Sequence, residues 1–360
     1  MDYFRQMAMV DTSFSNNLIA WYLQNKRDLP WRNTSDPYKV WLSEIILQQT
    51  RVAQGLPYYE KFENIYPTVH DLAQATEAEV LKTWQGLGYY SRARNLHVTA
   101  KMVSQEMDGI FPQSYKGLLK LKGVGDYTAS AIASICYNQP EAVVDGNVYR
   151  VLSRIFGIST PINTSAGQKQ FKELAQQLID SVRPGTFNQA VMEFGAKYCV
   201  PQNPDCGSCI FKNRCVAHKE NHVAELPVKI KAKPVKHRYF NYLVILTKNE
   251  STILKQRNAK GIWQKLYEFP LVESANFVDL ETLTEITQFK EFTKNIDLES
   301  ISLYNEKPIS HKLSHQHINT HFWILETSEA TPENIPISEI QDYAVPVLIE
   351  NFLSEFFENY

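Results

Sequence analysis

The sequence predicts a multidomain protein with an all-α N-terminal domain, a basic linker and an α+β C-terminal domain. Apolar residues recur at helical spacing through the first 220 residues, whereas short β-branched and aromatic runs dominate the last third. A lysine-rich stretch punctuated by Pro227 and Pro234 separates the two parts. A chain of 360 residues is longer than a domain with a single hydrophobic core usually is. We therefore expect domains at 1–220 and 237–360, joined by a linker at 221–236.

Helix signals follow one another through the N-terminal domain. Ser15 is expected to cap a first helix, and Pro37 to occupy the first turn of a second one. Val40, Trp41 and Ile45 are apolar positions of that second helix. Further helices are expected at residues 79–84, 95–107, 114–121, 127–137 and 171–182.

The C-terminal domain opens with strand-like segments. Residues 242–247 and 252–254 flank a polar turn and predict a β-hairpin. Residues 321–325 predict another strand, and residues 345–357 a helix near the end of the chain. This mixture predicts an α+β domain.

Charges are distributed unevenly along the chain. The formal net charge of −2 does not by itself favour a nucleic-acid partner. Residues 1–220 carry 23 Lys and Arg against 20 Asp and Glu, residues 221–240 carry 5 against 1, and residues 241–360 carry 9 against 18. An acidic C-terminal part therefore masks a mildly basic N-terminal part, which keeps nucleic acid open as a partner.

The chain carries no signal for a membrane or for export. No apolar run is long enough for a bilayer, and the first residues lack the regions of a signal peptide. We therefore expect no membrane partner and a cytoplasmic, reducing location, where free thiols are available as metal ligands.

Four of the five cysteines fall within 17 residues, in the spacing C-x6-C-x2-C-x5-C. Structural zinc usually takes two short cysteine pairs, and this run has only one. Four thiolates with unequal gaps suit a [4Fe–4S] cluster better, with zinc as the alternative. The fifth cysteine, Cys136, lies among apolar residues and is expected to be an inert thiol. The expected ligands are Cys199, Cys206, Cys209 and Cys215.

A glycine turn joins two of the predicted helices at residues 121–129. Gly123 and Gly125 allow a tight turn whose backbone N–H groups, at the start of the next helix, form an anion site. Lys120 and Lys122 add positive charge beside it. A Gly-x-Gly turn alone fits an ordinary connection between helices as well.

This turn, inside a helical domain that ends in a cysteine cluster, resembles the helix-hairpin-helix DNA glycosylases with an iron–sulfur cluster. The resemblance covers residues 10–220. Endonuclease III-like members carry a lysine two residues after the second glycine, where this chain has Tyr127. A tyrosine there resembles the MutY-type adenine DNA glycosylases. Matching stretches are Leu29-Pro30-Trp31-Arg32 and residues 41–50, 86–92 and 144–148.

The resemblance implies a monomeric, monofunctional enzyme that carries a [4Fe–4S] cluster and is associated with the nucleoid in a prokaryote. Its partner would be double-stranded DNA containing adenine opposite 8-oxoguanine or guanine. Two rivals remain open. One is an endonuclease III-like bifunctional enzyme acting on oxidised pyrimidines, and the other is a DNA-binding or redox-sensing iron–sulfur protein without glycosylase activity.

Cleaving an N-glycosidic bond to adenine requires a protonated leaving group and a carboxylate near the cationic sugar. Glu44 lies among apolar helix residues, which would keep it protonated for donation, and it matches the family's general acid. Asp145 precedes a predicted helix start, which would keep it ionised. The resemblance also places Tyr127 in this catalytic group.

The target adenine must be rotated out of the duplex, and the gap and the opposite base must be held. The resemblance assigns Arg32 and Glu193 to the adenine pocket, although a buried ion pair also explains Glu193. Lys212 and Arg214, in the cysteine loop, are expected near phosphates. The remaining expected DNA contacts are Gln48, Gln49, Leu87, Tyr89, Lys120, Lys122, Gly123, Gly125 and Asn147.

The C-terminal domain resembles the Nudix-like domain of the same family, chiefly over residues 261–270. No Nudix box follows, so magnesium-dependent pyrophosphatase chemistry is not expected. The family reads the base opposite adenine from a Phe-Ser-His turn, which corresponds here to Leu313, Ser314 and His315. Four nearby histidines match no common metal site by their spacing. They are His311, His315, His317 and His321.

Overall fold

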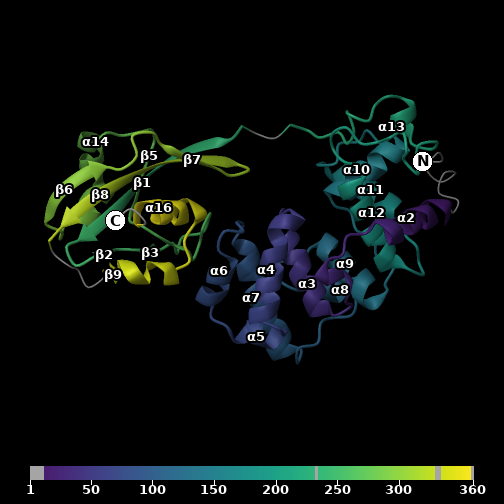
Figure 1. Ribbon diagram of the computed structural model, residues 1–360, viewed down its shortest axis with the longest axis horizontal. Helices are drawn as coiled ribbons and strands as arrows, with labels where there is room; N and C mark the ends of the chain where they lie inside the picture. Colours follow the sequence, from purple (N-terminus) through teal and green to yellow (C-terminus); the bar gives the residue numbers. More distant parts are fainter. Residues whose placement is uncertain (1–11, 232–233, 329–333, 358–360) are drawn as a thin grey trace. The chain divides into compact units, whose positions relative to one another are not determined.

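The computed structural model describes residues 12–231, 234–328 and 334–357, which form two compact units (Figure 1). The first unit comprises Met1–Gln74 and Asn95–Lys231, and the second comprises Ala75–Arg94 and Ala232–Tyr360. The boundaries expected from the sequence contain no such interruption at residues 75–94. No helix in the described residues is long and apolar enough to cross a membrane.

The regular elements described in the first unit are all helical, as the sequence predicts. Helix α3 begins at Pro37, and the Asp36 side chain caps it by accepting from the Tyr38 N–H. The prediction that Ser15 caps the first helix is wrong, because the backbone is helical from Thr12 onward. The elements are α2 (Thr12–Asn25), η1 (Pro30–Arg32), α3 (Pro37–Leu47), α4 (Val52–Ile65), α5 (Val69–Gln74), α7 (Ser91–Glu106), α8 (Tyr115–Leu118), α9 (Asp126–Tyr137), α10 (Gly146–Phe156), α11 (Ser165–Leu178), α12 (Pro184–Lys197) and α13 (Val216–Lys219).

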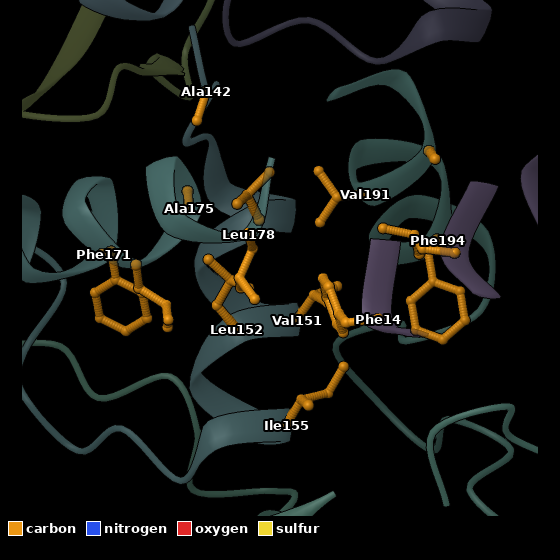
Figure 2. Close-up of a cluster of buried hydrophobic side chains, with 14 of the residues drawn as sticks. Phe14, Ala142, Val151, Leu152, Ile155, Phe171, Ala175, Leu178, Val191 and Phe194 are labelled. Carbon is orange, nitrogen blue, oxygen red and sulfur yellow. The ribbon is translucent and has the colours of Figure 1, made fainter. Parts of the chain in front are cut away.

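A hydrophobic core joins helices α2, α10, α11 and α12 (Figure 2). Phe14 stacks on Phe211 with ring centroids 4.9 Å apart, and Phe194 meets Phe211 edge-on at 5.4 Å. All three rings are fully buried, and each contributes about 1.5–3 kcal/mol through removal from water. Because Phe211 belongs to the cysteine loop, this core fixes that loop against the helices that carry the candidate site.

The connection between α8 and α9 is the predicted hairpin. Gly123 has a φ of 77°, a conformation that glycine adopts without strain. A Cβ atom at that position would lie 2.8 Å from Asn95 Cβ, so space excludes a side chain as well. Gly125 is the N-cap of α9 and makes no side-chain cap bond. The turn therefore presents backbone N–H groups at a helix start.

The second unit is built on a seven-stranded mixed sheet. Strands β1 (Lys236–Thr247) and β8 (Gln316–Thr327) are parallel from Lys236↔Gln316 to Thr247↔Thr327. The predicted hairpin is confirmed by the pairing of Thr247 with Ser251, and the predicted strand at 321–325 is part of β8. The other strands of the unit are β2 (Ser251–Thr252), β3 (Lys255–Gln256), β4 (Tyr267–Glu268), β5 (Leu271–Ser274), β6 (Leu298–Leu303), β7 (Ile309–Lys312) and β9 (Ile335–Pro336).

Helices cover this sheet. A small core forms where Leu243, Trp323 and Leu325 meet Leu283 and Phe289 of two short helices. The predicted C-terminal helix is confirmed as α16, and its Phe352 stacks on a ring of β8. The helical elements of the unit are α6 (Glu77–Trp84), α14 (Leu280–Glu285), α15 (Thr287–Thr293), η2 (Ile337–Asp342) and α16 (Val347–Phe357).

Candidate active site

A cavity of about 520 Å³ lies within the first unit. It is lined by η1, by the inner face of α3 and by the starts or inner faces of α9, α10 and α12. Polar groups that converge in one sizeable cavity mark a candidate active site. The cavity brings together six of the residues predicted from the sequence, namely Arg32, Glu44, Tyr127, Asp145, Asn147 and Glu193.

Glu44 projects from α3 and is 8% exposed. Its helix neighbours Val40, Trp41 and Ile45 are at most 2% exposed, so little water reaches the carboxyl group. Burial raises the pKa of Glu44 to about 7, against a lowering effect of a hydrogen bond with the Tyr127 hydroxyl. A carboxyl with this pKa holds its proton near neutral pH and can donate it.

Asp145 is the N-cap of α10 and accepts three hydrogen bonds. Its Oδ1 accepts from the backbone N–H of Asn147 at 2.9 Å and of Val148 at 2.8 Å. Its Oδ2 accepts from Asn147 Nδ2 at 2.8 Å. Burial raises the pKa of Asp145 above its usual value, and these hydrogen bonds oppose that shift. With three donors against one for Glu44, Asp145 is the carboxyl that ionises first.

Tyr127 lies in the first turn of α9, close to both carboxyl groups. Its hydroxyl is 3.2 Å from Met192 Sδ, and it also hydrogen-bonds to Glu44. Burial raises the pKa of Tyr127 well above its usual value, and the two nearby acids raise it further. The side chain is therefore a neutral hydrogen-bond donor across the pH range in which proteins are stable.

Glu193 on α12 forms ion pairs with two arginines at the same cavity. Its fully buried carboxylate accepts from Arg27 Nη2 and from Arg32 Nη2, both at 2.6 Å. Burial alone would raise its pKa, but the hydrogen bonds from the two arginines lower the pKa of Glu193 to about 2. Arg27 was not singled out in the sequence, where it appears as one charge of a polar turn. The expected buried ion pair of Glu193 is confirmed. The residue also lines the cavity, and its place in an adenine pocket stays a prediction.

A chain of hydrogen bonds leads from Asp145 to the cysteine loop. Arg150 Nη2 donates to Asn147 Oδ1 at 2.9 Å, and Arg150 Nε donates to the carbonyl oxygen of Cys199 at 2.8 Å. Gly195 lets α12 approach this chain, because a Cβ there would lie 2.7 Å from Asn147 Cβ. From the sequence alone, Arg150 would be placed on the exposed face of a helix, and no neighbouring residue indicates its role.

The four clustered cysteines line one small, apolar-walled cavity. The Phe211 N–H points at Cys209 Sγ at 3.4 Å, and Arg154 Nη1 lies 3.5 Å from Cys199 Sγ. Within the described ranges, no three His, Cys, Asp or Glu side chains converge closely enough to hold a single metal ion. Four soft sulfur donors with N–H groups beside them fit an iron–sulfur cluster, whose sulfurs commonly receive such hydrogen bonds.

The predicted phosphate-binding residues lie outside the cavity, on the hairpin. Lys120, Lys122, Gly123 and Gly125 are all exposed. This arrangement allows the backbone N–H groups of the turn and two ammonium groups to meet a DNA backbone. The structure places the hairpin in the same unit as the cavity.

The residues expected to fill the DNA gap are distributed over both units. Gln48 ends α3 and donates to Thr128 Oγ1 at 3.3 Å, and Gln49, next to it, is exposed with a φ of 57°. In the second unit, Tyr89 is 47% exposed, whereas Leu87 is only 4% exposed. The Leu87 side chain is packed into the unit and presents little surface in this structure, so its expected DNA contact stays a prediction.

Ser314 and His315 are exposed in the turn between β7 and β8 of the second unit. The neighbouring histidines pack against other side chains. His311 packs against Trp263 with ring centroids 5.6 Å apart, and His321 is 7% exposed. In the part of the chain that the structure describes, these histidines form no metal-binding group.

Comparisons with known proteins agree with this fold. Residues 42–177 match the family described as HhH-GPD superfamily base excision DNA repair protein, and residues 241–355 match the NUDIX domain. A solved thermostable thymine-DNA glycosylase is 31% identical with a TM-score of 0.54, covering 58% of this chain and 96% of that chain. The helical unit thus defines a helix-hairpin-helix protein of the base-excision repair class, followed by a Nudix-like domain.

Two curated relatives allow a more specific family assignment. The adenine DNA glycosylase of Buchnera aphidicola subsp. Baizongia pistaciae is 36% identical over 312 residues, covering 85% of this chain and 84% of that protein. The chain belongs to the adenine DNA glycosylase family. The Arabidopsis thaliana adenine DNA glycosylase is 42% identical over 295 residues, which cover 71% of this chain but only 46% of that longer protein. The chain therefore spans about half the length of such relatives.

Proposed function

We propose that this protein hydrolyses the N-glycosidic bond of adenine paired with 8-oxoguanine or guanine in duplex DNA. The observation that carries the proposal is the cavity in which Glu44, with a pKa of about 7, faces the hydrogen-bonded carboxyl of Asp145. Membership of the adenine DNA glycosylase family supports adenine as the base removed.

The two acids divide the chemistry between them. Glu44 gives its proton to the purine, and the bond between the base nitrogen and C1′ of the deoxyribose breaks. Asp145, as a carboxylate, stabilises the positive charge that develops on the sugar. Water then adds to C1′ and returns one proton to Glu44, so that the products are neutral adenine and an abasic sugar.

Hydrolysis without strand cleavage follows from the cavity's composition. Strand-cleaving glycosylases attack C1′ with an amine and form a Schiff base. None of the described residues that line this cavity is a lysine, and Tyr127 holds the position of the lysine in the endonuclease III-like pattern. This composition favours the monofunctional enzyme over the bifunctional rival.

Adenine recognition is assigned to the ion pair on α12. The Glu193 carboxylate already accepts four hydrogen bonds from Arg27 and Arg32, so its role is to orient these two side chains, whose guanidinium groups are donors for the ring nitrogens of adenine. The two arginines keep Glu193 ionised at any physiological pH.

DNA binding rests on three further elements. The hairpin with Lys122, Gly123 and Gly125 holds a phosphate, and Lys212 contributes charge from the cysteine loop. The cysteine loop would hold a [4Fe–4S] cluster, which supplies local structure rather than a chemical step. The base opposite adenine would meet Tyr89 of the second unit, while Gln48 and Gln49 would fill the gap left by the flipped base. Ser314 and His315 would contact that opposite base as well.

A base-release assay tests this function. Duplexes that differ only in the base opposite adenine (8-oxoguanine, guanine or thymine) are incubated with excess protein, and free adenine is quantified. We expect release from the first two and not from the adenine–thymine duplex. Release of no adenine from any duplex would refute the proposal.

A further inference from the structure

Helix α6 and the loop after it belong to the same compact unit as the Nudix-like domain. Gln85, which ends α6, is central to the contact. Its Oε1 accepts from the backbone N–H of Val345 at 3.2 Å, and its Nε2 donates to Glu350 Oε1 at 2.8 Å. Beside it, Lys82 Nζ donates to the carbonyl oxygen of Tyr343 at 3.3 Å. One amide thus uses both of its ends to join α6 to the start of α16 and the segment before it.

The residues that form these hydrogen bonds line a cavity of about 550 Å³. Its walls come from α6, η2 and α16, and they include Lys82, Gln85 and Glu350 themselves. Close packing fixes positions only where side chains fill the space between elements. Across this hollow, the hydrogen bonds of Gln85 join α6 to α16, and the Tyr90 hydroxyl adds a bond to the carbonyl oxygen of Val345 at 3.4 Å.

The loop after Gln85 leads to Tyr89. Trp84 Nε1 donates to the carbonyl oxygen of Gly88 at 3.0 Å, which closes the loop on itself. The Arg92 guanidinium lies 5.0 Å from the Trp84 ring and 5.6 Å from the Tyr89 ring. Tyr89 also has a φ of 47°, a strained backbone that only a well-ordered surrounding maintains. Gln85 and Tyr89 therefore lie in one short loop that is held by its own contacts.

The same unit contains the turn that carries Ser314. Phe352 of α16 stacks on Phe322 of β8 at 4.0 Å, and β8 begins two residues after Ser314. Trp263 packs against His311 of β7, the strand that ends two residues before Ser314. Helix α16, which binds Gln85 through Glu350, thus packs on the strand that follows this turn.

We propose that Gln85 is a positioning residue that couples the Tyr89 loop to the turn carrying Ser314, so that both meet the base opposite adenine as one unit. The inference rests on the proposed function and extends it. Preference for 8-oxoguanine over guanine would depend on a residue that contacts neither base. Gln85 would act only through the placement of the two groups that do.

Substitution of Gln85 by alanine tests this role. We measure single-turnover adenine release from duplexes with adenine opposite 8-oxoguanine or opposite guanine. For Gln85→Ala we expect the ratio of the two rates to fall about fivefold, equivalent to about 1 kcal/mol, with release opposite guanine unchanged. Gln341→Ala, in the wall of the same cavity, is the matched control and should keep the wild-type ratio.

A charge exchange tests the geometry itself. Gln85→Glu places two carboxylates together at Glu350 and should lower the ratio at least as far as the alanine variant. The double variant Gln85→Glu/Glu350→Gln restores a hydrogen bond in the opposite direction and leaves an acceptor for the Val345 N–H. We expect it to recover the wild-type ratio. If the double variant does not recover the wild-type ratio, the hydrogen bond between residues 85 and 350 does not position the Tyr89 loop, and the inference is overturned.

Hydrogen exchange of the backbone amides at residues 86–91 provides a readout that does not depend on activity. We expect faster exchange there in Gln85→Ala and wild-type exchange in Gln341→Ala and in the double variant. An unchanged rate ratio, an equal loss on both duplexes, or unchanged exchange would each overturn the inference. If wild-type protein releases no adenine at all, the proposed function fails, and the exchange rates still decide whether Gln85 holds the loop.

Discussion

Asn147 holds Asp145 through both carboxylate oxygens, with its backbone N–H 2.9 Å from Oδ1 and its side-chain Nδ2 2.8 Å from Oδ2. The same amide accepts from Arg150 through its oxygen at 2.9 Å. Both polar atoms of the Asn147 side chain are thus hydrogen-bonded, one to the Asp145 carboxylate and one to Arg150. The orientation of Asp145 is a property of this pair rather than of Asp145 alone.

Replacement of Asn147 by alanine should therefore impair chemistry more than folding. Loss of one oriented hydrogen bond to a catalytic carboxylate is expected to slow single-turnover adenine release about 10–100-fold. Binding of an adenine–guanine duplex, measured by fluorescence anisotropy, should change less than threefold. A variant with wild-type release rate would show that the Asn147 side chain is not needed to orient Asp145.

The pH dependence of adenine release should follow the two carboxyl groups. Glu44 acts as its protonated form, so with its pKa raised to about 7 the rate should fall about tenfold per pH unit above that value. Asp145 acts ionised, and because its pKa is raised above 3.8 the rate should also fall on the acid side. Single-turnover rates from pH 5 to 9 test this. A rate that rises steadily through pH 7 to 9 would contradict the assignment of Glu44 as the acid.

Breaking the ion pair on α12 should cost stability. Glu193→Gln leaves the two arginines without their carboxylate, and we expect a loss of about 3 kcal/mol in the free energy of unfolding at pH 7. The pKa of Glu193 is lowered to about 2, so its contribution is present above about pH 4.5 and is lost as the pH falls toward 2. Denaturant unfolding at pH 7 and pH 3 measures both effects. The wild-type advantage over Glu193→Gln should shrink at pH 3, and an equal difference at both pH values would contradict the ion-pair account.

The cysteine loop provides its own matched control. Purified protein should contain about four iron and four sulfide per chain, and Cys209→Ser should lower this content and destabilise the helical unit. Cys136→Ser should retain the wild-type content, because Cys136 lies on α9, away from the cavity that the other four cysteines line. Zinc in place of iron in anaerobically purified protein would contradict the cluster assignment.

The two candidate catalytic acids can be picked out from the sequence, because the residues beside each of them in the chain mark its position. Glu44 lies among apolar residues at helical spacing, but this pattern alone fits a solvated helix glutamate better, and the family resemblance is what favours a buried acid. Asp145 precedes Gly146 and Asn147 in a typical helix start, which the structure confirms. The raised pKa of Asp145 could not be predicted from these residues, because the depth of burial depends on segments distant in sequence.

Long-range partners explain what the sequence could not predict. Arg27 meets Glu193 across 166 residues, and Arg150 meets the carbonyl oxygen of Cys199 across 49. Helix α4 was not predicted, because Gly55 and Pro57 lie inside it and normally indicate a turn. A Cβ at Gly55 would lie 2.8 Å from Leu47 Cδ2, so close packing against α3 explains that glycine. Such tertiary contacts leave no periodic signal.

The most direct test of the central claim is single-turnover adenine release by Glu44→Gln on an adenine–8-oxoguanine duplex, with duplex binding measured in parallel. A glutamine keeps the size of the side chain but has no proton to give. We predict that release falls about 10²–10⁴-fold while the dissociation constant changes less than threefold. Release within tenfold of the wild-type rate would contradict the account, because adenine would then leave without the proton from Glu44.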